Sequence, residues 1–357
     1  MVFDLTKRGK AMNQPITNNT QLDILFVTPP ISDVHLPFAA IPQLMGACKR
    51  AGQTCMWIDL GIVACKILFE RHYKERAKKF LCREYYDERV ADWGDSPVAT
   101  FDEYLAKVSF LTEPDFSLER AKSVFQVGGM LEKGIIDALF DSILYFSTVT
   151  AKHEVFNVKE YFTDSSSGLI DECIANDATI ELLKSDIRLV GITVTWITQF
   201  QYTKELITAL KLINPSLKIV LGGSAITFAA KYSAENVEHL LDLSDFLIIG
   251  EGDTAIVKLA QYLSGDIRST DEIPGLIYRN SEGILSNPTT TEDIETTSAP
   301  CFDGVDFNQY VLPDPMFPYG TSRGCFTDSA HSVITTRITG TTTARKVSIR
   351  SLLIYLK

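Results

Sequence analysis

Two glycine-bearing segments supply the backbone groups best suited to a ligand site. One is 222-GGSAIT-227 and the other is 250-GEGDT-254. Glycine lets a bulky ligand approach the backbone without meeting a Cβ atom. The second segment precedes a predicted helix, where backbone N–H groups point outward and can donate to polar edges of a ligand. Taken singly, each pattern is as typical of a tight turn or a helix start as of a binding site.

The elements that must position these segments follow a repeated order of strand, helix and strand. Apolar runs predict strands at 23–28, 54–60, 188–196, 217–223 and 245–250. Helical periodicity predicts helices at 41–52 and 200–214, a mostly helical stretch at 225–243, and a turn followed by a helix within 250–265. Continuous apolar strands that alternate with helices indicate a parallel sheet covered on both sides. The predicted fold class is therefore α/β, a doubly wound, Rossmann-like parallel sheet.

The ends of these strands define where a ligand would bind. In an open parallel sheet, ligands bind in the crevice beyond the carboxyl ends of the strands. Four segments are predicted to fall there: 28–42, 193–199, 222–227 and 250–254. Because both glycine segments belong to this set, we predict a ligand site at this rim of the sheet.

The chain divides into five parts. Residues 1–21 form a polar leader, 22–63 and 171–270 form the α/β domain, 64–170 form a helical insertion, 271–326 form a hairpin and a proline-punctuated connector, and 327–357 form a tail. The insertion is too long to be an ordinary loop. A cap over the ligand and a dimer face are both compatible with its amphipathic helices.

Composition narrows the class of partner. The net charge of −11 disfavours sequence-independent binding of nucleic acid, which needs a basic footprint. No apolar run is long enough to suggest a membrane span or a signal peptide, so we expect a cytoplasmic protein without a membrane partner. The seven cysteines show no paired spacing, which indicates a reducing compartment. A small-molecule partner is favoured, and the oligomeric state is left open.

Several short motifs follow one another along the chain. They are Pro29–Pro30 after the first strand, Gly222-Gly223-x-x-x-Thr227, Asp245 followed by 250-GEG-252, 273-IPGLIYR-279 and 321-TSRGCF-326. Together they resemble the cobalamin-binding domain at the N-terminus of cobalamin-dependent radical SAM enzymes. The resemblance covers roughly residues 22–326, and the helical insertion fits it least well.

The resemblance implies cobalamin as the cofactor, with its corrin ring over the strand ends and its tail directed toward the sheet. The cofactor-binding residues that it implies are Pro30, Thr195, Trp196, Gly222, Gly223, Ser224, Ile226, Gly250, Glu251 and Gly252. Trp196 would add stacking area, although packing on a neighbouring helix is an equally suitable role. The chain departs from the family at Ala225, where the family commonly has a histidine. His35 is interpreted as a surface residue rather than a cobalt ligand.

Cys325 is the only candidate metal ligand that the resemblance supplies. Radical SAM enzymes continue from this cysteine into C-x3-C-x2-C, whose three thiolates hold a [4Fe-4S] cluster with one iron open to S-adenosylmethionine. Here Ser329 and Ser332 occupy the two following cysteine positions. We therefore expect neither the cluster nor S-adenosylmethionine to bind this chain, and we assign no catalytic residue.

The residues after Cys325 suggest a reading-frame hypothesis. If the codons of Ser329 and Ser332 end in T, the neighbouring frame encodes cysteine beside each of them. Residues from about 327 onward would then be out-of-frame translation, and the missing part would include the radical SAM barrel. A natural truncation and a tail with its own role are the rival explanations, and the coding DNA distinguishes them.

These observations lead to one functional prediction and two weaker ones. The chain is predicted to be the cobalamin-binding portion of a radical SAM enzyme, of methyltransferase type, without catalytic competence as given. The alternative is a stand-alone α/β domain that binds or senses a nucleotide-like ligand, although no G-x-G-x-x-G follows the first strand and no Walker lysine is present. A hydrolase is disfavoured further, because the sequence has no G-x-S-x-G elbow.

Overall fold

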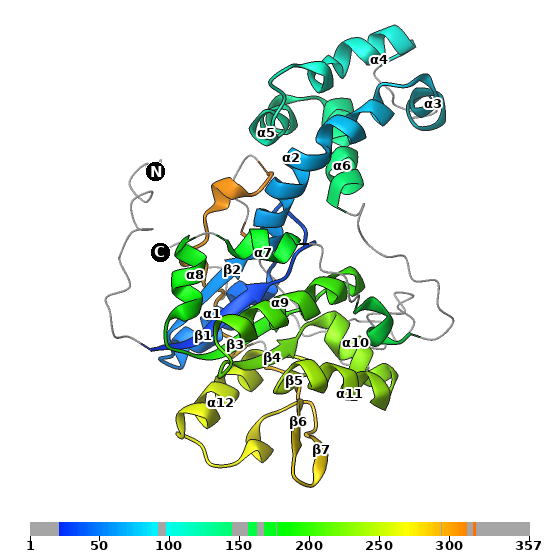
Figure 1. Cartoon of the computed structure of the whole chain (residues 1–357). Coiled ribbons are helices and arrows are strands. Elements are labelled where there is room, and N and C mark those ends of the chain that lie inside the picture. The colour runs from blue at the N-terminus through cyan, green and yellow to red at the C-terminus, as the bar shows by residue number, and fades with distance from the viewer. Residues whose placement is uncertain are drawn as a thin grey trace, which may run out of the picture.

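A computed structural model describes residues 21–91, 98–144, 156–162, 168–175, 177–293, 295–312 and 317–318. Its centre is a seven-stranded sheet in the order β2-β1-β3-β4-β5-β6-β7 (Figure 1). The strands are β1 (Leu22–Thr28), β2 (Cys55–Asp59), β3 (Ile187–Thr193), β4 (Lys218–Gly222), β5 (Phe246–Ile248), β6 (Leu276–Asn280) and β7 (Gly283–Ser286). Strands β1 to β5 run parallel, which confirms the predicted doubly wound fold.

The helices lie between and after these strands. The α-helices are α1 (Ala40–Arg50), α2 (Leu60–Phe80), α3 (Arg83–Tyr85), α4 (Phe101–Lys107), α5 (Leu118–Val127), α6 (Met130–Leu144), α7 (Leu169–Ile174), α8 (Asp177–Lys184), α9 (Phe200–Ile213), α10 (Ser224–Tyr232), α11 (Ala234–Leu243) and α12 (Asp253–Ser264). Single turns of other helix types are η3 (Tyr86–Val90), η4 (Ser109–Thr112), η5 (Val158–Tyr161), η6 (Ile197–Gln199), η7 (Thr270–Glu272) and η8 (Phe307–Gln309).

Side chains alternate between the two faces of the sheet and build two separate cores. On β3, Val190 and Ile192 join the larger core, together with residues of α9, α10 and α11. Leu189 joins the smaller core, which holds residues of α1 and α12. Because both faces are covered, the central strands are apolar at nearly every position. The sheet therefore presents its carboxyl-end rim as the place left open to ligands.

The predicted hairpin is present and extends the sheet. β6 pairs antiparallel with β5, and β7 pairs antiparallel with β6. The local pattern around NSEG predicts the turn but carries no information about which edge strand the hairpin joins. The hairpin thus covers the edge that β5 would otherwise expose.

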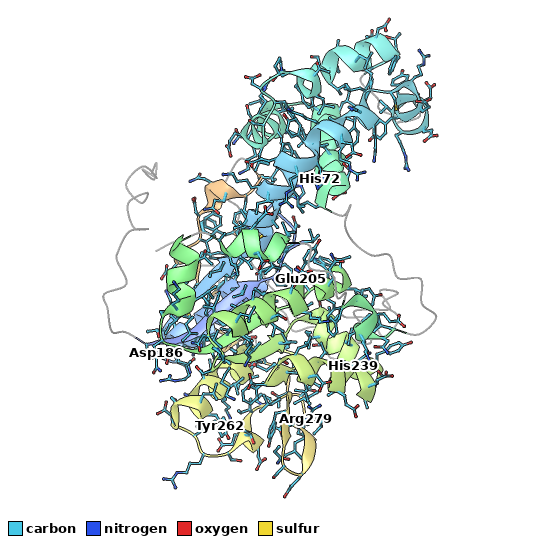
Figure 2. The ribbon with its side chains drawn as sticks, in the orientation of Figure 1. His72, Asp186, Glu205, His239, Tyr262 and Arg279 are labelled. Atoms are coloured by element: carbon cyan, nitrogen blue, oxygen red, sulfur yellow. The ribbon has the colours of Figure 1, made fainter. Side chains whose placement is uncertain are left out.

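The predicted helical insertion is also present, as helices α2 to α6 between β2 and β3 (Figure 1). These helices project away from the sheet, with His72 on α2 well separated from Glu205 on α9 and His239 on α11 (Figure 2). Phe69 on α2 packs on Phe140 of α6 with ring centroids 5.6 Å apart, and both belong to the larger core. The insertion therefore shares its apolar interior with one face of the sheet.

One predicted helix is interrupted. Residues 225–243 form two helices, α10 and α11, that meet at Ser233. The hydroxyl of Ser233 accepts a hydrogen bond from the backbone N–H of Asn236 at 3.2 Å, so this serine caps the start of α11. The serine was therefore the boundary signal within this stretch.

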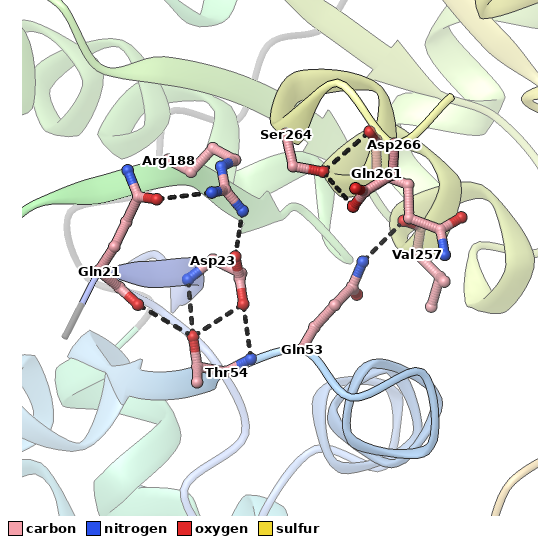
Figure 3. Close-up of polar contacts among 9 residues, drawn as sticks. All are labelled: Gln21, Asp23, Gln53, Thr54, Arg188, Val257, Gln261, Ser264 and Asp266. Carbon is pink, nitrogen blue, oxygen red and sulfur yellow. Dashed lines mark hydrogen bonds and ion pairs between the residues drawn. The ribbon is translucent and has the colours of Figure 1, made fainter. Parts of the chain in front are cut away.

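The amino-end edge of the sheet is closed by polar contacts (Figure 3). Asp23 of β1 pairs with Arg188 of β3, and its carboxylate accepts a hydrogen bond from the backbone N–H of Thr54 at 2.8 Å. The side-chain amide of Gln53 donates to the carbonyl of Val257 on α12 at 2.9 Å. These contacts satisfy polar groups that strand ends leave unpaired. Among the described residues no helix is both long and apolar enough to span a membrane.

Candidate functional site

A cavity of about 230 Å³ opens at the carboxyl-end rim, on the face covered by α1 and α12. Five of the residues proposed from the sequence line it together: Gly222, Gly223, Gly250, Glu251 and Gly252. They come from the ends of β4 and β5, which are neighbours in the sheet. The structure therefore brings the two glycine segments to one place.

The cavity exists because side chains are missing from this face. A Cβ atom placed on Gly252 would lie 3.4 Å from Leu44 Cδ2 and 3.9 Å from Ile248 Cγ2, and both side chains line the cavity. On β3, Gly191 also leaves space on this face, since a Cβ atom there would lie 3.2 Å from the ring of Phe26. Gly191 was not among the proposed residues. A glycine inside an apolar strand was the signal that would have identified it.

Gly223 has a different requirement. Its φ is +106°, and a Cβ atom there would lie 2.4 Å from the carbonyl oxygen of Val194. The backbone N–H of Ala225 donates to that same oxygen at 3.1 Å. Gly223 is therefore needed to join β4 to α10, whatever else it contacts.

Polar groups reach the cavity from three elements. Thr193, at the end of β3, lines the cavity and is 6% exposed. The side-chain amide of Gln43 on α1 donates to Asp253 Oδ1 at 3.0 Å and to the carbonyl of Ser298 at 2.8 Å. Gln43 thus ties α1, α12 and the connector together beside the cavity. Thr193 and Asp253 belong to the predicted rim segments 193–199 and 250–254, whereas Gln43 was not identified from the sequence.

Thr195, Trp196 and Ser224 gather beside the cavity rather than in its lining. The hydroxyl of Ser224 donates to the carbonyl of Thr195 at 2.8 Å, which joins the loops after β4 and β3. The side chain of Trp196 is 50% exposed at this rim. Pro30 is buried in the loop after β1. Half of the Trp196 surface is therefore exposed at this rim.

Ile226 lies elsewhere. Its side chain is fully buried in the larger core, on the face opposite the cavity. One residue further along, the buried hydroxyl of Thr227 accepts a hydrogen bond from the backbone N–H of Gly250 at 3.1 Å. Thr227 therefore holds the turn after β5 against the start of α10. This contact gives a physical reason for a threonine four residues after Gly223.

The N-terminus of α12 is occupied by a side chain of the connector. Glu292 accepts hydrogen bonds from the backbone N–H of Thr254 at 2.7 Å and from the Thr254 hydroxyl at 2.8 Å. The carboxylate of Glu251 in turn accepts from the backbone N–H of Glu292. The sequence predicted open N–H donors here, whereas the donor of Thr254 is already bound. A carboxylate at this position also disfavours a phosphate group through like-charge repulsion.

His35 bridges the rim and the insertion. Its Nδ1 lies 2.8 Å from Asp33 Oδ1, and its Nε2 lies 2.8 Å from Asp137 Oδ1 on α6. The hydrogen bond with Asp33 raises the pKa of His35 more than partial burial lowers it, and the charge of Asp137 adds to the rise. Both ring nitrogens face carboxylates, which fits the surface interpretation of this residue.

The connector also docks at the end of β2. The hydroxyl of Tyr310 donates to Asp59 Oδ2 at 2.8 Å, and the backbone N–H of Gly61 donates to Asp59 Oδ1 at 3.0 Å. Burial raises the pKa of Asp59 to about 6, although both hydrogen bonds lower it. The backbone N–H of Val311 donates to the carbonyl of Val34 at 2.9 Å. The connector is thus fixed against the loop after β1.

The predicted metal ligand, Cys325, lies outside the described residues, as do the serines at 329 and 332. Within the described ranges, no group of three or more histidine, cysteine, aspartate or glutamate side chains could hold a metal ion. The described site is a cavity and a rim built from backbone, apolar, hydroxyl, amide and carboxylate groups.

A comparison with protein families identifies the domain that contains this rim. Residues 151–260 match the family model described as B12 binding domain. The matched range includes β3, β4 and β5, all the cavity glycines and Trp196. This match confirms the predicted cobalamin-binding domain and its cofactor, cobalamin. No curated protein matches the sequence significantly.

Solved structures with a similar arrangement are radical SAM enzymes. The radical S-adenosylmethionine methyltransferase TsrM from Kitasatospora setae, with cobalamin and a [4Fe-4S] cluster bound, is 16% identical and gives a TM-score of 0.42 over 93% of this chain and 44% of its own. The cobalamin-dependent S-adenosylmethionine radical enzyme OxsB, with aqua-cobalamin and S-adenosylmethionine bound, is 13% identical and gives a TM-score of 0.46 over 94% of this chain and 31% of its own. The chain therefore spans less than half the length of either enzyme.

Proposed function

We propose that the carboxyl-end rim of the sheet binds cobalamin, with the corrin ring over the strand-end turns and the nucleotide tail in the cavity. The observation that carries this proposal is the cavity whose glycines all lie within the matched B12 binding domain. Sites for whole small molecules typically measure about 300–1,000 Å³. A cavity of about 230 Å³ suits one part of a large ligand, while the remainder lies on the rim.

The lining of the cavity suits a flat aromatic base. Phe26 and Val220 belong to the sheet, and Leu44 and Ile256 belong to the two covering helices. These apolar side chains supply area for stacking and burial. The hydroxyl of Thr193 would offer one hydrogen bond to a ring nitrogen. The chain would thus provide an apolar slot with a hydroxyl in its lining.

The residues of the rim would hold the ring and exclude water from one of its faces. Gly222 and Gly223 keep the floor free of side chains, and Trp196 offers an exposed aromatic surface beside it. Bound cobalamin supplies a cobalt centre that can carry a methyl group, and the protein supplies position and shielding. No described residue is assigned a catalytic role.

We further propose that this domain serves a cobalamin-dependent radical SAM enzyme of methyltransferase type. The support is the resemblance carried by 273-IPGLIYR-279 and 321-TSRGCF-326. In this proposal the connector of residues 287–312 carries the chain from the cobalamin site toward the cluster motif. The contacts of Glu292 and Tyr310 with the rim support such a link. The substrate would be selected outside the described residues.

The test compares hydroxocobalamin with cobinamide, which has the same corrin ring but lacks the nucleotide tail. Purified protein is incubated with each compound, desalted, and examined by visible absorbance. We expect cobalamin to be retained and cobinamide to be retained much more weakly, since only cobalamin can fill the cavity. Equal retention of the two compounds would show that the nucleotide tail does not occupy the cavity. Loss of both compounds, with binding of a nucleotide instead, would favour the alternative ligand class.

A further inference from the structure

Gln199 is a buried polar side chain at the rim that the proposed cobalamin contacts leave unexplained. The residue is 1% exposed and stands at the start of α9. Its Oε1 accepts hydrogen bonds from the backbone N–H groups of Thr195 at 2.7 Å and of Trp196 at 3.1 Å. Its Nε2 donates to the carbonyl of Pro29 at 3.2 Å. One side chain therefore joins the loop after β3 to the loop after β1.

The contacts extend to the loop after β4. The carbonyl of Thr195, whose N–H is held by Gln199, accepts the hydroxyl of Ser224 at 2.8 Å. A buried amide is stable only when its hydrogen bonds are made, and a partly satisfied one costs free energy. The conformation of the Trp196 backbone is thus coupled to three strand ends through Gln199.

The two described tryptophans are held differently. The indole N–H of Trp57 donates to Thr28 Oγ1 at 3.0 Å, so that side chain is fixed by its own polar group. Trp196 is 50% exposed, and its backbone N–H is held by the side chain of Gln199. A large aromatic side chain on a rigid backbone loses little entropy when a flat ligand stacks on it. Gln199 supplies that rigidity.

We propose that Gln199 is a positioning residue that holds Trp196 as the aromatic platform for the corrin ring. This inference rests on the proposed binding of cobalamin at the rim. Gln199 acts through Trp196 and through the loop after β1, without touching the ligand. Loss of its three hydrogen bonds releases the Trp196 backbone and lowers affinity for the cofactor.

A double-mutant cycle tests this role. The dissociation constant for hydroxocobalamin is measured for the unchanged chain, Gln199→Met, Trp196→Ala and the double variant. Methionine keeps the length of the side chain and removes all three hydrogen bonds. Because this change also lowers stability, the dissociation constants are measured under conditions in which each variant is folded. We expect each single change to weaken binding about 10-fold, and the double variant to bind no more weakly than Trp196→Ala alone. Additive losses, or unchanged affinity in Gln199→Met, would overturn the inference.

Thr203→Val is the matched control. The hydroxyl of Thr203 donates to the carbonyl of Gln199 at 2.8 Å, and the residue is fully buried in the same turn of α9. Its loss removes a buried hydrogen bond but leaves the rim loops connected. We expect thermal unfolding to shift in Thr203→Val while the affinity for hydroxocobalamin stays unchanged. A similar loss of affinity in this control would show that Gln199 has only a general structural role.

A second readout needs no cofactor. In a background of Trp57→Phe and Trp93→Phe, the fluorescence anisotropy of Trp196 reports the motion of this side chain alone. We expect Gln199→Met to lower the anisotropy and Thr203→Val to leave it unchanged. If the unchanged chain fails to retain hydroxocobalamin, the proposed function is wrong. If it retains the cofactor but anisotropy is the same in Gln199→Met, only the positioning role is wrong.

Discussion

The two faces of the central sheet are filled differently near the carboxyl ends of the strands. On β3, Val190 and Ile192 are buried in the larger core, as is Val194 directly after the strand. On the other side of the same strand, Gly191 and Thr193 line the cavity. The strand is therefore closed on one face and open on the other. The difference shows that a ligand site can be made in a packed sheet by omitting side chains on one face alone.

The closed face should respond to mutation with the largest change in stability. Leu221 on β4 is fully buried in the larger core. Leu221→Ala leaves a hole there and should lower the free energy of unfolding by about 2–5 kcal/mol. Urea denaturation measures this change. The affinity of the folded fraction for hydroxocobalamin should stay the same, and a loss of affinity without a loss of stability would contradict the assignment of the two faces.

The open face should respond with a change in binding. Gly252 has a φ of −104°, which any residue can adopt, and its side chain would enter the cavity. We expect Gly252→Leu to fold and to bind hydroxocobalamin about 10- to 100-fold more weakly, since overfilling a packed site costs about 1–3 kcal/mol. Equilibrium titration by absorbance measures the affinity. Gly129→Leu, in the insertion, is the control that should bind like the unchanged chain.

A smaller effect is expected from the contact between the connector and α12, beside the open face. Glu292→Ala removes the carboxylate that accepts the backbone N–H of Thr254 at the start of α12. This change should lower the free energy of unfolding by about 1 kcal/mol. Thermal unfolding measures the shift. Glu295→Ala, an exposed neighbour in the same connector, should produce no comparable shift. Equal shifts in the two variants would show that the cap does not stabilise α12.

The smallest expected effect is a pH dependence from the contact between the rim and the insertion. The pKa of His35 is raised by its carboxylate partners, so its contribution to stability is complete below about pH 6.5 and is lost as pH rises through the raised pKa. Thermal unfolding between about pH 6.5 and 8.5 should therefore show falling stability. The titration of Asp59, with a pKa of about 6, lies mainly below this window.

His35→Asn should remove most of that slope, because the neutral side chain cannot gain a proton between Asp33 and Asp137. His72→Asn on α2 is the control and should keep the slope. A slope that survives in His35→Asn would assign the pH dependence to other groups.

Local patterns were enough to predict the sheet, its covering helices and the glycine turns. Gly222 and Gly252 were identified because glycine next to a strand end has a meaning within a few residues of sequence. The links that Gln199 makes to the loop after β1 and Glu292 makes to α12 were not identified, because these partners are far away in the chain. Gln199 contacts a carbonyl 170 residues earlier, and Glu292 caps a residue 38 positions before it. Neither long-range contact can be predicted from the local sequence composition.

The path of the connector determines where the chain can be divided. From residue 287 to residue 312 it contacts α12 through Glu292, α1 through Ser298 and the end of β2 through Tyr310. A recombinant fragment that stops after β7 lacks all three contacts, and the carboxylate of Asp59 loses its hydroxyl donor. A fragment that keeps all three contacts therefore extends at least to Tyr310, well past the last strand.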